Sequence, residues 1–192
     1  MNVLIACEFS GIIREAFKDK GHNAWSCDLL DSEIKGNHFI DMVQNKLNLG
    51  WDLMIAHPPC THLAVSGARW FKDKKEEQQI AIDFFMLLIN APIKKICVEN
   101  PVSSLIFKMP PFSQEIQPYQ FGNPYSKKTR LWLKGLPELK PTRILKKYRT
   151  FMPSNTGGAK RGQHHLSGIP KNNIESSKTF QGIADAMAEQ WG

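Results

Sequence analysis

Short apolar runs that alternate with helical patterns constrain the fold of this 192-residue chain more than any other feature. Six of the runs have the length and the β-branched or aromatic content of strands. They cover residues 3–7, 24–27, 39–41, 53–56, 95–98 and 130–133, and the helical patterns cover 12–20, 75–90 and 183–190. Such alternation predicts an α/β fold with a mostly parallel sheet and helices on both of its faces.

Two of the helical patterns also predict a buried face. Within 75–90, four apolar side chains are predicted to pack together on the core: Ile80, Phe84, Leu87 and Leu88. The closing pattern places Ile183, Met187 and Trp191 at helical spacing, which predicts a second apolar face.

Composition and cysteine usage favour a cytoplasmic protein. Hydrophobic residues make up 42% of the chain and charged residues 22%, as in soluble globular proteins. No apolar run approaches the ~20 residues of a membrane span, and the first run lacks the basic flank of a secretory signal, so no membrane partner is predicted. The four scattered cysteines predict reduced thiols. Residues 57–62 contain two histidines and Cys60, but no second ligand cluster follows, so no metal is predicted.

The positive charge is concentrated in one stretch. Residues 137–178 contain nine lysines and arginines against two acids, which equals the whole net charge of +7. We expect a small irregular basic lobe there, with 1–136 and 179–192 forming the main domain. A concentrated basic region favours a nucleic-acid partner, and a solvated surface is the alternative. Six side chains are candidates for phosphate contacts: Arg143, Lys146, Lys147, Arg149, Lys160 and Arg161.

Unusual polar residues gather where the predicted strands end, which is where open α/β sheets bind ligands. They occupy 8–11, 28, 41, 57–60 and 99–101. In 57–60, Pro58 and Pro59 rule out a regular continuation of the strand, so Cys60 is presented by a rigid turn. A thiolate there can attack an electrophilic carbon, although a lone cysteine is also commonly a small buried apolar residue.

Glu99 follows an apolar strand, where an unpaired carboxylate is costly to bury. Such a carboxyl group can bind the edge of cytosine or exchange a proton with it. The alternative roles are a helix cap or an ion pair.

Together these residues resemble the DNA cytosine-C5 methyltransferase family, most closely its short phage and prophage versions. Phe9-Ser10-Gly11 resembles the first cofactor motif, although Ile12, Ile13 and Arg14 follow where further glycines are usual. Pro58-Pro59-Cys60 resembles the nucleophile motif, and Glu99-Asn100-Pro101 resembles the Glu-Asn-Val motif. Residues 125–133 resemble the Gln-x-Arg-x-Arg strand and keep its last arginine, Arg130, and 179–191 resemble the closing helix.

The resemblance implies a Rossmann-like fold and an activity that depends on S-adenosylmethionine. Asp28 is similar to the acid that binds the ribose hydroxyls, and Asp41 to the acid near the adenine. Six residues are expected at the cofactor: Phe9, Ser10, Gly11, Asp28, Asp41 and Pro58.

The implied reaction is methyl transfer to C5 of cytosine in DNA, duplex or single-stranded, in a bacterial or phage-infected cell. Cys60 is expected to attack C6, Glu99 to hold the base, and Arg130 to neutralise charge and lower the pKa of Cys60. Free cytosine nucleotides and single-stranded DNA are alternative substrates. A degenerate fold that binds nucleic acid or a host protein is the non-enzymatic alternative.

Overall fold

The computed structural model describes residues 1–60, 62–63, 75–101, 108–150 and 178–192. The main sheet comprises seven strands: β1 (Asn2–Ala6), β2 (Asn23–Asp28), β3 (His38–Ile40), β4 (Leu53–Ala56), β5 (Lys95–Pro101), β6 (Gln114–Ile116) and β8 (Thr129–Lys134). The α-helices are α1 (Ile12–Asp19), α2 (Lys75–Ile89) and α4 (Gln181–Trp191), and two short 3-10 helices are η1 (Val43–Lys46) and η4 (Pro118–Gln120). Strands β7 (Tyr125–Ser126) and β9 (Arg149–Thr150) form a separate parallel pair.

The sheet order is β3-β2-β1-β4-β5-β8-β6. Neighbouring strands from β3 to β5 are parallel, and β8 is antiparallel to both β5 and β6. This arrangement confirms the predicted Rossmann-like α/β fold with a mostly parallel sheet. Strand β6 was absent from the prediction because three residues of mixed polarity carry no measurable periodicity.

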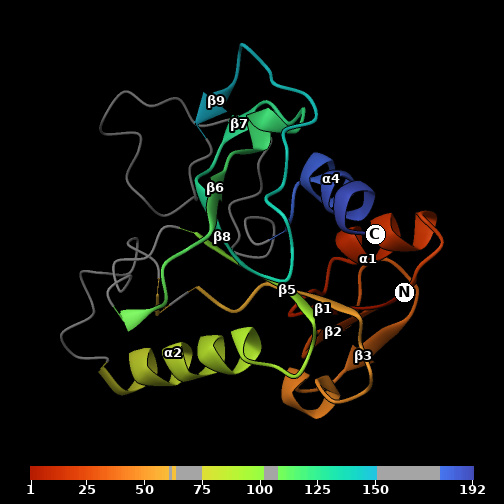
Figure 1. Ribbon diagram of the computed structural model, residues 1–192, viewed down its shortest axis with the longest axis vertical. Coiled ribbons are helices and arrows are strands. Elements are labelled where there is room, and N and C mark those ends of the chain that lie inside the picture. The colour runs from red at the N-terminus through yellow and green to blue at the C-terminus, as the bar shows by residue number, and fades with distance from the viewer. Residues whose placement is uncertain (61, 64–74, 102–107, 151–177) are drawn as a thin grey trace.

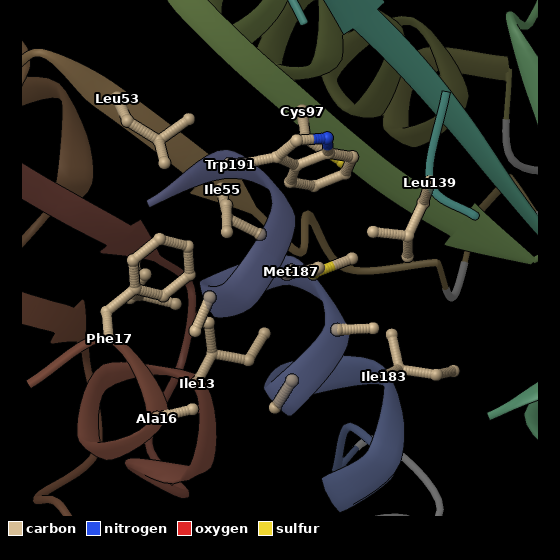
Figure 2. Packing of buried hydrophobic residues seen from close by; sticks show 14 of the residues in the cluster. Ile13, Ala16, Phe17, Leu53, Ile55, Cys97, Leu139, Ile183, Met187 and Trp191 are labelled. Carbon is tan, nitrogen blue, oxygen red and sulfur yellow. The ribbon is translucent and has the colours of Figure 1, made fainter. Parts of the chain in front are cut away.

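Helices cover both faces of the sheet, as predicted (Figure 1). Alternate residues of the central strands supply two separate cores, because successive side chains of a strand point to opposite faces. Val3 and Ile5 pack on the side of α1 and α4, whereas Leu4 and Ala6 pack on the side of α2. Figure 2 shows α4 lying against the first of these cores, with Ile183, Met187 and Trp191 directed into it. The predicted face of the closing helix is therefore confirmed.

The predicted face of α2 is only partly right, since Leu88 is buried and Phe84 packs on the core but the other two residues are exposed. Ile80 is 61% exposed and Leu87 is 42% exposed. The buried residues of α2 are Gln78, Ile82, Phe85 and Leu88, of which only Leu88 was predicted. The helix is apolar around much of its circumference, so its periodicity favoured no single face, and contact with Trp132 decided the orientation of Phe85.

The chain after residue 136 still packs on the main domain. Leu139 is fully buried in the core beside α4, and its backbone N–H and C=O both bond to the side chain of Gln114. Further along, Tyr148 stacks on Tyr119 at 4.0 Å between ring centres. Residues 151–177, which hold most of the predicted basic lobe, lie outside the described residues. Within the described part, no helix combines the length and apolar character needed to cross a membrane.

Candidate active site

The turn after β4 is held from two sides. The backbone N–H of His57 donates to the carbonyl of Ala6 at the end of β1, at 2.9 Å. On the other side, Asn100 of β5 donates from Nδ2 to the carbonyl of Pro58 at 3.1 Å. Asn100 is fully buried, so this bond is shielded from water. The two contacts and the two prolines make Cys60 the end of a braced turn, as the sequence predicted.

Glu99 forms the centre of the site together with His57, whose Nδ1 lies 3.0 Å from Oε2 of Glu99. The side chain of His57 is only 10% exposed, and that of Glu99 is 21% exposed. Burial alone raises the pKa of Glu99, but the hydrogen bond and charge of His57, the charge of Lys127 and a hydrogen bond from Thr129 outweigh it and lower the pKa below its usual value. Glu99 is therefore an anion at neutral pH.

A small pocket opens beside this pair at the carboxyl ends of β4 and β5. Its wall combines the pair with residues before and within β8 and with the start of α4. Its lining residues are His57, Glu99, Lys127, Thr129, Lys178, Thr179, Phe180, Ile183 and Met187. The Nζ of Lys127 lies 5.9 Å from the centre of the Phe180 ring, so a cation and an aromatic face stand next to the carboxylate.

Cys60 is half-buried and lies close enough to Glu99 to be affected by its charge. Burial and the Glu99 carboxylate raise the pKa of the Cys60 thiol, and Lys127 opposes them. The expectation that the thiol has a lowered pKa is therefore wrong, and Cys60 is a protonated thiol at neutral pH. The opposing cation is Lys127, not Arg130.

Arg130 lies on the other face of the sheet. In the antiparallel pairing of β5 with β8, Arg130 is opposite Asn100, whereas Glu99 is opposite Leu131. Paired residues share a face, so Arg130 points away from the Glu99 pocket. Its guanidinium lies 4.4 Å from the centre of the Phe112 ring, and its Nε lies 3.6 Å from Glu115. The structure thus does not bring the third predicted catalytic residue to the other two.

The second part of the site lies at the end of β1. Glu8 is buried, and its Oε1 accepts a hydrogen bond from the N–H of Ile13 at 2.7 Å. Its Oε2 accepts one from the N–H of Arg14 at 3.3 Å, and Ser10 adds a bond to Oε1. These bonds cap the first turn of α1, so its free N–H groups are taken by a carboxylate of the chain itself. A phosphate group has no place there.

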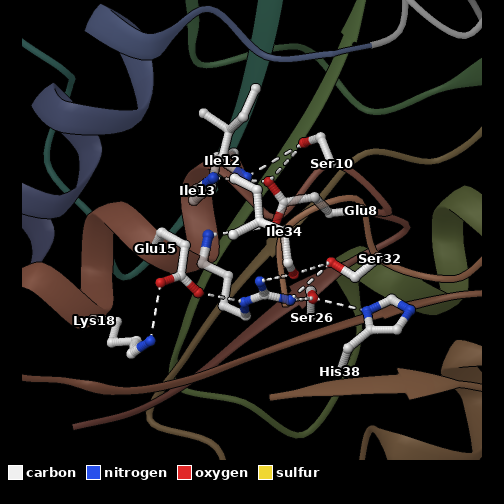
Figure 3. A network of polar contacts seen from close by, with 11 residues as sticks. Glu8, Ser10, Ile12, Ile13, Glu15, Lys18, Ser26, Ser32, Ile34 and His38 are labelled. Carbon is white, nitrogen blue, oxygen red and sulfur yellow. Dashed lines mark hydrogen bonds and ion pairs between the residues drawn. The ribbon is translucent and has the colours of Figure 1, made fainter. Parts of the chain in front are cut away.

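Arg14 ties this helix to the loop after β2 through Ser32 and Ile34. Figure 3 labels these two residues within the network of polar contacts. Its side chain is fully buried, and all three of its nitrogens donate hydrogen bonds. The acceptors are Glu15, Ser26, Ser32 and the carbonyl of Ile34, at distances of 2.5–3.0 Å. Gly11 begins the helix at a φ of 76°, and a Cβ there would approach Nη2 of Arg14 to 2.8 Å. Arg14, which stands where the family's cofactor motif usually has a further glycine, thus holds the loop after β2 in place.

Asp28 and Asp41 end two neighbouring strands, as the sequence predicted. Oδ1 of Asp28 accepts a bond from the N–H of Leu30. Asp41 pairs with Lys46 at 2.7 Å and accepts bonds from Asn45 and the N–H of Met42, which together lower the pKa of Asp41 to about 2. Asp41 is therefore charged at neutral pH.

Exposed apolar side chains surround the two acids. Leu29 is 70% exposed, Ile40 is 63% exposed and Met42 is 54% exposed. Large exposed apolar residues that adjoin acids at strand ends are typical of a site for a ligand with both flat apolar and hydroxyl groups.

The predicted phosphate contacts come from the chain after β8, not from the strand ends described above. Arg143, Lys146, Lys147 and Arg149 are all exposed. Arg143 joins η4 through its backbone, since its N–H donates to Gln120 and its C=O accepts from Gly122. Lys160 and Arg161 lie outside the described residues.

Several residues of the site were not predicted from the sequence. His57 was considered only as a metal ligand, and among the described residues no three possible metal ligands lie together. Lys127 and Phe180 were not singled out, because nothing in their local sequence indicates that they meet. The buried pairing of Arg14 has a signal in hindsight: an arginine inside an otherwise apolar helical face needs partners.

No protein-family model matches the chain, and no curated protein matches it. Solved structures do resemble it: the methyltransferase EhMeth of Entamoeba histolytica (16% identity, TM-score 0.46), a DNMT2 mutant of Spodoptera frugiperda (16%, 0.44) and an rRNA methylase of Escherichia coli (15%, 0.40). They cover 81%, 79% and 69% of this chain, which spans only 59%, 55% and 56% of theirs. At these scores the likeness carries no conclusion about the activity of this chain.

Proposed function

We propose that the chain transfers a methyl group from S-adenosylmethionine to C5 of cytosine in DNA, with Cys60 as the nucleophile. The observation that carries the proposal is the pairing of a braced Pro-Pro-Cys turn with an ionised Glu99 at the end of the adjacent strand. A thiol and an anionic carboxylate that follow two adjacent strands suit a base that is attacked at one ring carbon while its amino edge is held.

The β1–β3 edge supports S-adenosylmethionine over a dinucleotide. The Glu8 cap fills the helix terminus that a pyrophosphate would need, whereas a sulfonium cofactor has no phosphate. The Asp28 carboxylate is suited to ribose hydroxyls, and the exposed side chains of Leu29, Ile40 and Met42 are suited to the face of an adenine. The residues present therefore fit the cofactor, which supplies an electrophilic methyl group when bound.

In the proposed mechanism the cytosine leaves the stack and enters the pocket. Cys60 loses its proton to water, and its sulfur bonds to C6 while the electrons of the C5–C6 double bond become available at C5. The Glu99 carboxylate accepts a hydrogen bond from the amino group of the base. C5 then takes the methyl group as the bond between methyl and sulfonium sulfur breaks. The C5 proton passes to water as the C6–sulfur bond breaks, which restores the C5–C6 double bond and the thiolate. Lys127 is placed to offset negative charge near Glu99 and Cys60.

A 5-fluorocytosine oligonucleotide tests the nucleophile, because fluorine at C5 cannot leave as a proton and the covalent adduct persists. With S-adenosylmethionine present, the wild-type chain is expected to form an adduct that survives denaturation. Cys60→Ser is expected to form none, and Cys97→Ala, which alters a thiol in the core, is the matched control. Adduct formation should accelerate as the pH rises above neutrality, because burial and Glu99 raise the pKa of Cys60. An adduct in Cys60→Ser would refute the assignment.

The substrate is tested separately with labelled cofactor. Duplex and single-stranded oligonucleotides and dCTP are offered in competition, and the form that carries the label away most efficiently is the substrate class. Absence of both cofactor binding by calorimetry and label transfer would favour the non-enzymatic alternative.

A further inference from the structure

We propose that His57 is a positioning residue that orients the Glu99 carboxylate at the pocket before a base binds. The identity of the base rests on the proposed function, whereas the His57–Glu99 unit rests on the geometry alone.

The position of the imidazole is fixed by its backbone. His57 donates its N–H to Ala6, and it precedes Pro58, which restricts the backbone of the residue before it. The ring is only 10% exposed. An ionised carboxylate only accepts hydrogen bonds, so Nδ1 of His57 must carry the proton in the 3.0 Å contact with Glu99.

The second nitrogen of the His57 ring, Nε2, takes no part in the contact with Glu99. Nε2 of His57 is buried and has no hydrogen-bond partner among the described residues, which is rare for a buried polar atom. The charged groups around the ring come from four segments: Glu8 after β1, Glu99 on β5, Lys127 before β8 and Lys178 before α4. The imidazole thus stands between two carboxylates, and the direct hydrogen bond goes to Glu99.

The consequence is a carboxylate that is oriented before a base binds. With Oε2 of Glu99 held by Nδ1–H of His57, the carboxylate is in place to accept a hydrogen bond from the amino group of cytosine. Without His57, the imidazole no longer sets this orientation, and burial is opposed less strongly, so Glu99 becomes protonated more easily.

The first test measures Glu99 directly, with carbon-13 NMR of its carboxyl group during a pH titration. His57→Phe is expected to raise the pKa of Glu99 relative to the wild-type chain. His22→Phe is the matched control and should leave the pKa of Glu99 unchanged, because His22 lies beside the amino group of Met1 and outside the pocket. An unchanged Glu99 pKa in folded His57→Phe would overturn the inference, and this readout does not need the chain to be active.

The second test measures the rate of adduct formation with the 5-fluorocytosine oligonucleotide. The rate is expected to fall by ~10-fold or more in folded His57→Phe, because misplacing a group that holds the substrate can cost ~100-fold. His57→Asn keeps a donor near the Nδ1 position and should recover part of the rate. An equal rate in the wild type and His57→Phe, or no recovery in folded His57→Asn, overturns the proposal. A wild-type chain that forms no adduct refutes the proposed function instead, and the NMR titration then still decides the role of His57.

Discussion

Two buried polar clusters lie at the same edge of the sheet, and their hydrogen bonding differs. In the Arg14 cluster, all three guanidinium nitrogens have acceptors, and Ser26 and His38 extend the chain of bonds. In the cluster at the ends of β4 and β5, two buried atoms have no partner among the described residues: Nε2 of His57, beside Glu99, and Oδ1 of Asn100, on the opposite face of β5. A saturated network holds a fold together, whereas a buried cluster with unpaired atoms is suited to receive a ligand.

The two clusters also differ in the pKa shifts of their carboxyl groups. Burial raises the pKa of Glu8, which caps α1 beside Arg14, although the N–H groups of Ile13 and Arg14 and the charge of His57 oppose it. Burial also acts to raise the pKa of Glu99, but the hydrogen bond and charge of His57, together with Lys127 and Thr129, outweigh it and lower the pKa. We therefore expect the first cluster to govern stability and the second to govern activity.

The largest effect on stability is expected from Arg14→Ala. This change leaves Ser26, Ser32 and the Ile34 carbonyl without their donor and should reduce the free energy of unfolding by about 3–5 kcal/mol. Urea unfolding measures it. Lys18→Ala removes an exposed partner of Glu15 and serves as the control. Equal losses in the two variants would contradict the special role of the Arg14 cluster.

A smaller loss is expected from Gly11→Ala, which tests how closely Arg14 packs on the start of α1. The φ of 76° alone should cost ~1–2 kcal/mol in a residue with a Cβ. Gly21→Ala is the matched control, because Gly21 has a φ of 83° and no atom within 4 Å of an added Cβ. Gly11→Ala should be the more destabilising change in thermal unfolding. Identical shifts would mean that the Arg14 side chain moves aside freely.

A direct comparison of the clusters comes from Ser26→Ala and Asn100→Ala, both at fully buried positions. Ser26→Ala removes an acceptor from a saturated network and should cost ~1–3 kcal/mol. Asn100→Ala removes one bond to Pro58 together with an unpaired oxygen, so its cost should be below ~1 kcal/mol. The adduct rate should show the reverse order, since Asn100 braces the Cys60 turn. A greater loss of stability in Asn100→Ala would break the comparison.

The smallest effect concerns pH. Because the pKa of Glu8 is raised, its contribution to stability is complete below the ordinary value of 4.5 and is lost as the pH rises through the folded value. The contribution of Glu99, whose pKa is lowered, is present above 4.5 and is lost as the pH falls through its folded value. Urea unfolding from about pH 3 to about pH 7 should therefore change slope in opposite directions in Glu8→Gln and Glu99→Gln. Slopes that change in the same direction would show that one of the two shifts is misassigned.

Local patterns in the sequence predicted the order of six strands and three helices, an α/β fold with a mostly parallel sheet, the face of the closing helix and the braced Cys60 turn. These follow from apolar runs of strand length, helical spacing and two consecutive prolines, whereas the Rossmann-like class came from the resemblance to a family. Short or evenly apolar segments did not reveal their roles, so β6 was missed and half of the predicted face of α2 was wrong.

Only the tertiary structure decided which polar side chains meet. The antiparallel register of β8 placed Arg130 on the face away from Glu99, and a shift of one residue would have reversed that result. His57 and Glu99 are 42 positions apart in the chain, and their contact depends on β4 and β5 being neighbours. Local sequence sets the conformation of each segment, but the pairing of distant strands sets the partners of each side chain. The chemistry of Cys60 therefore depends on that pairing, because burial and Glu99 raise its pKa and Lys127 opposes them.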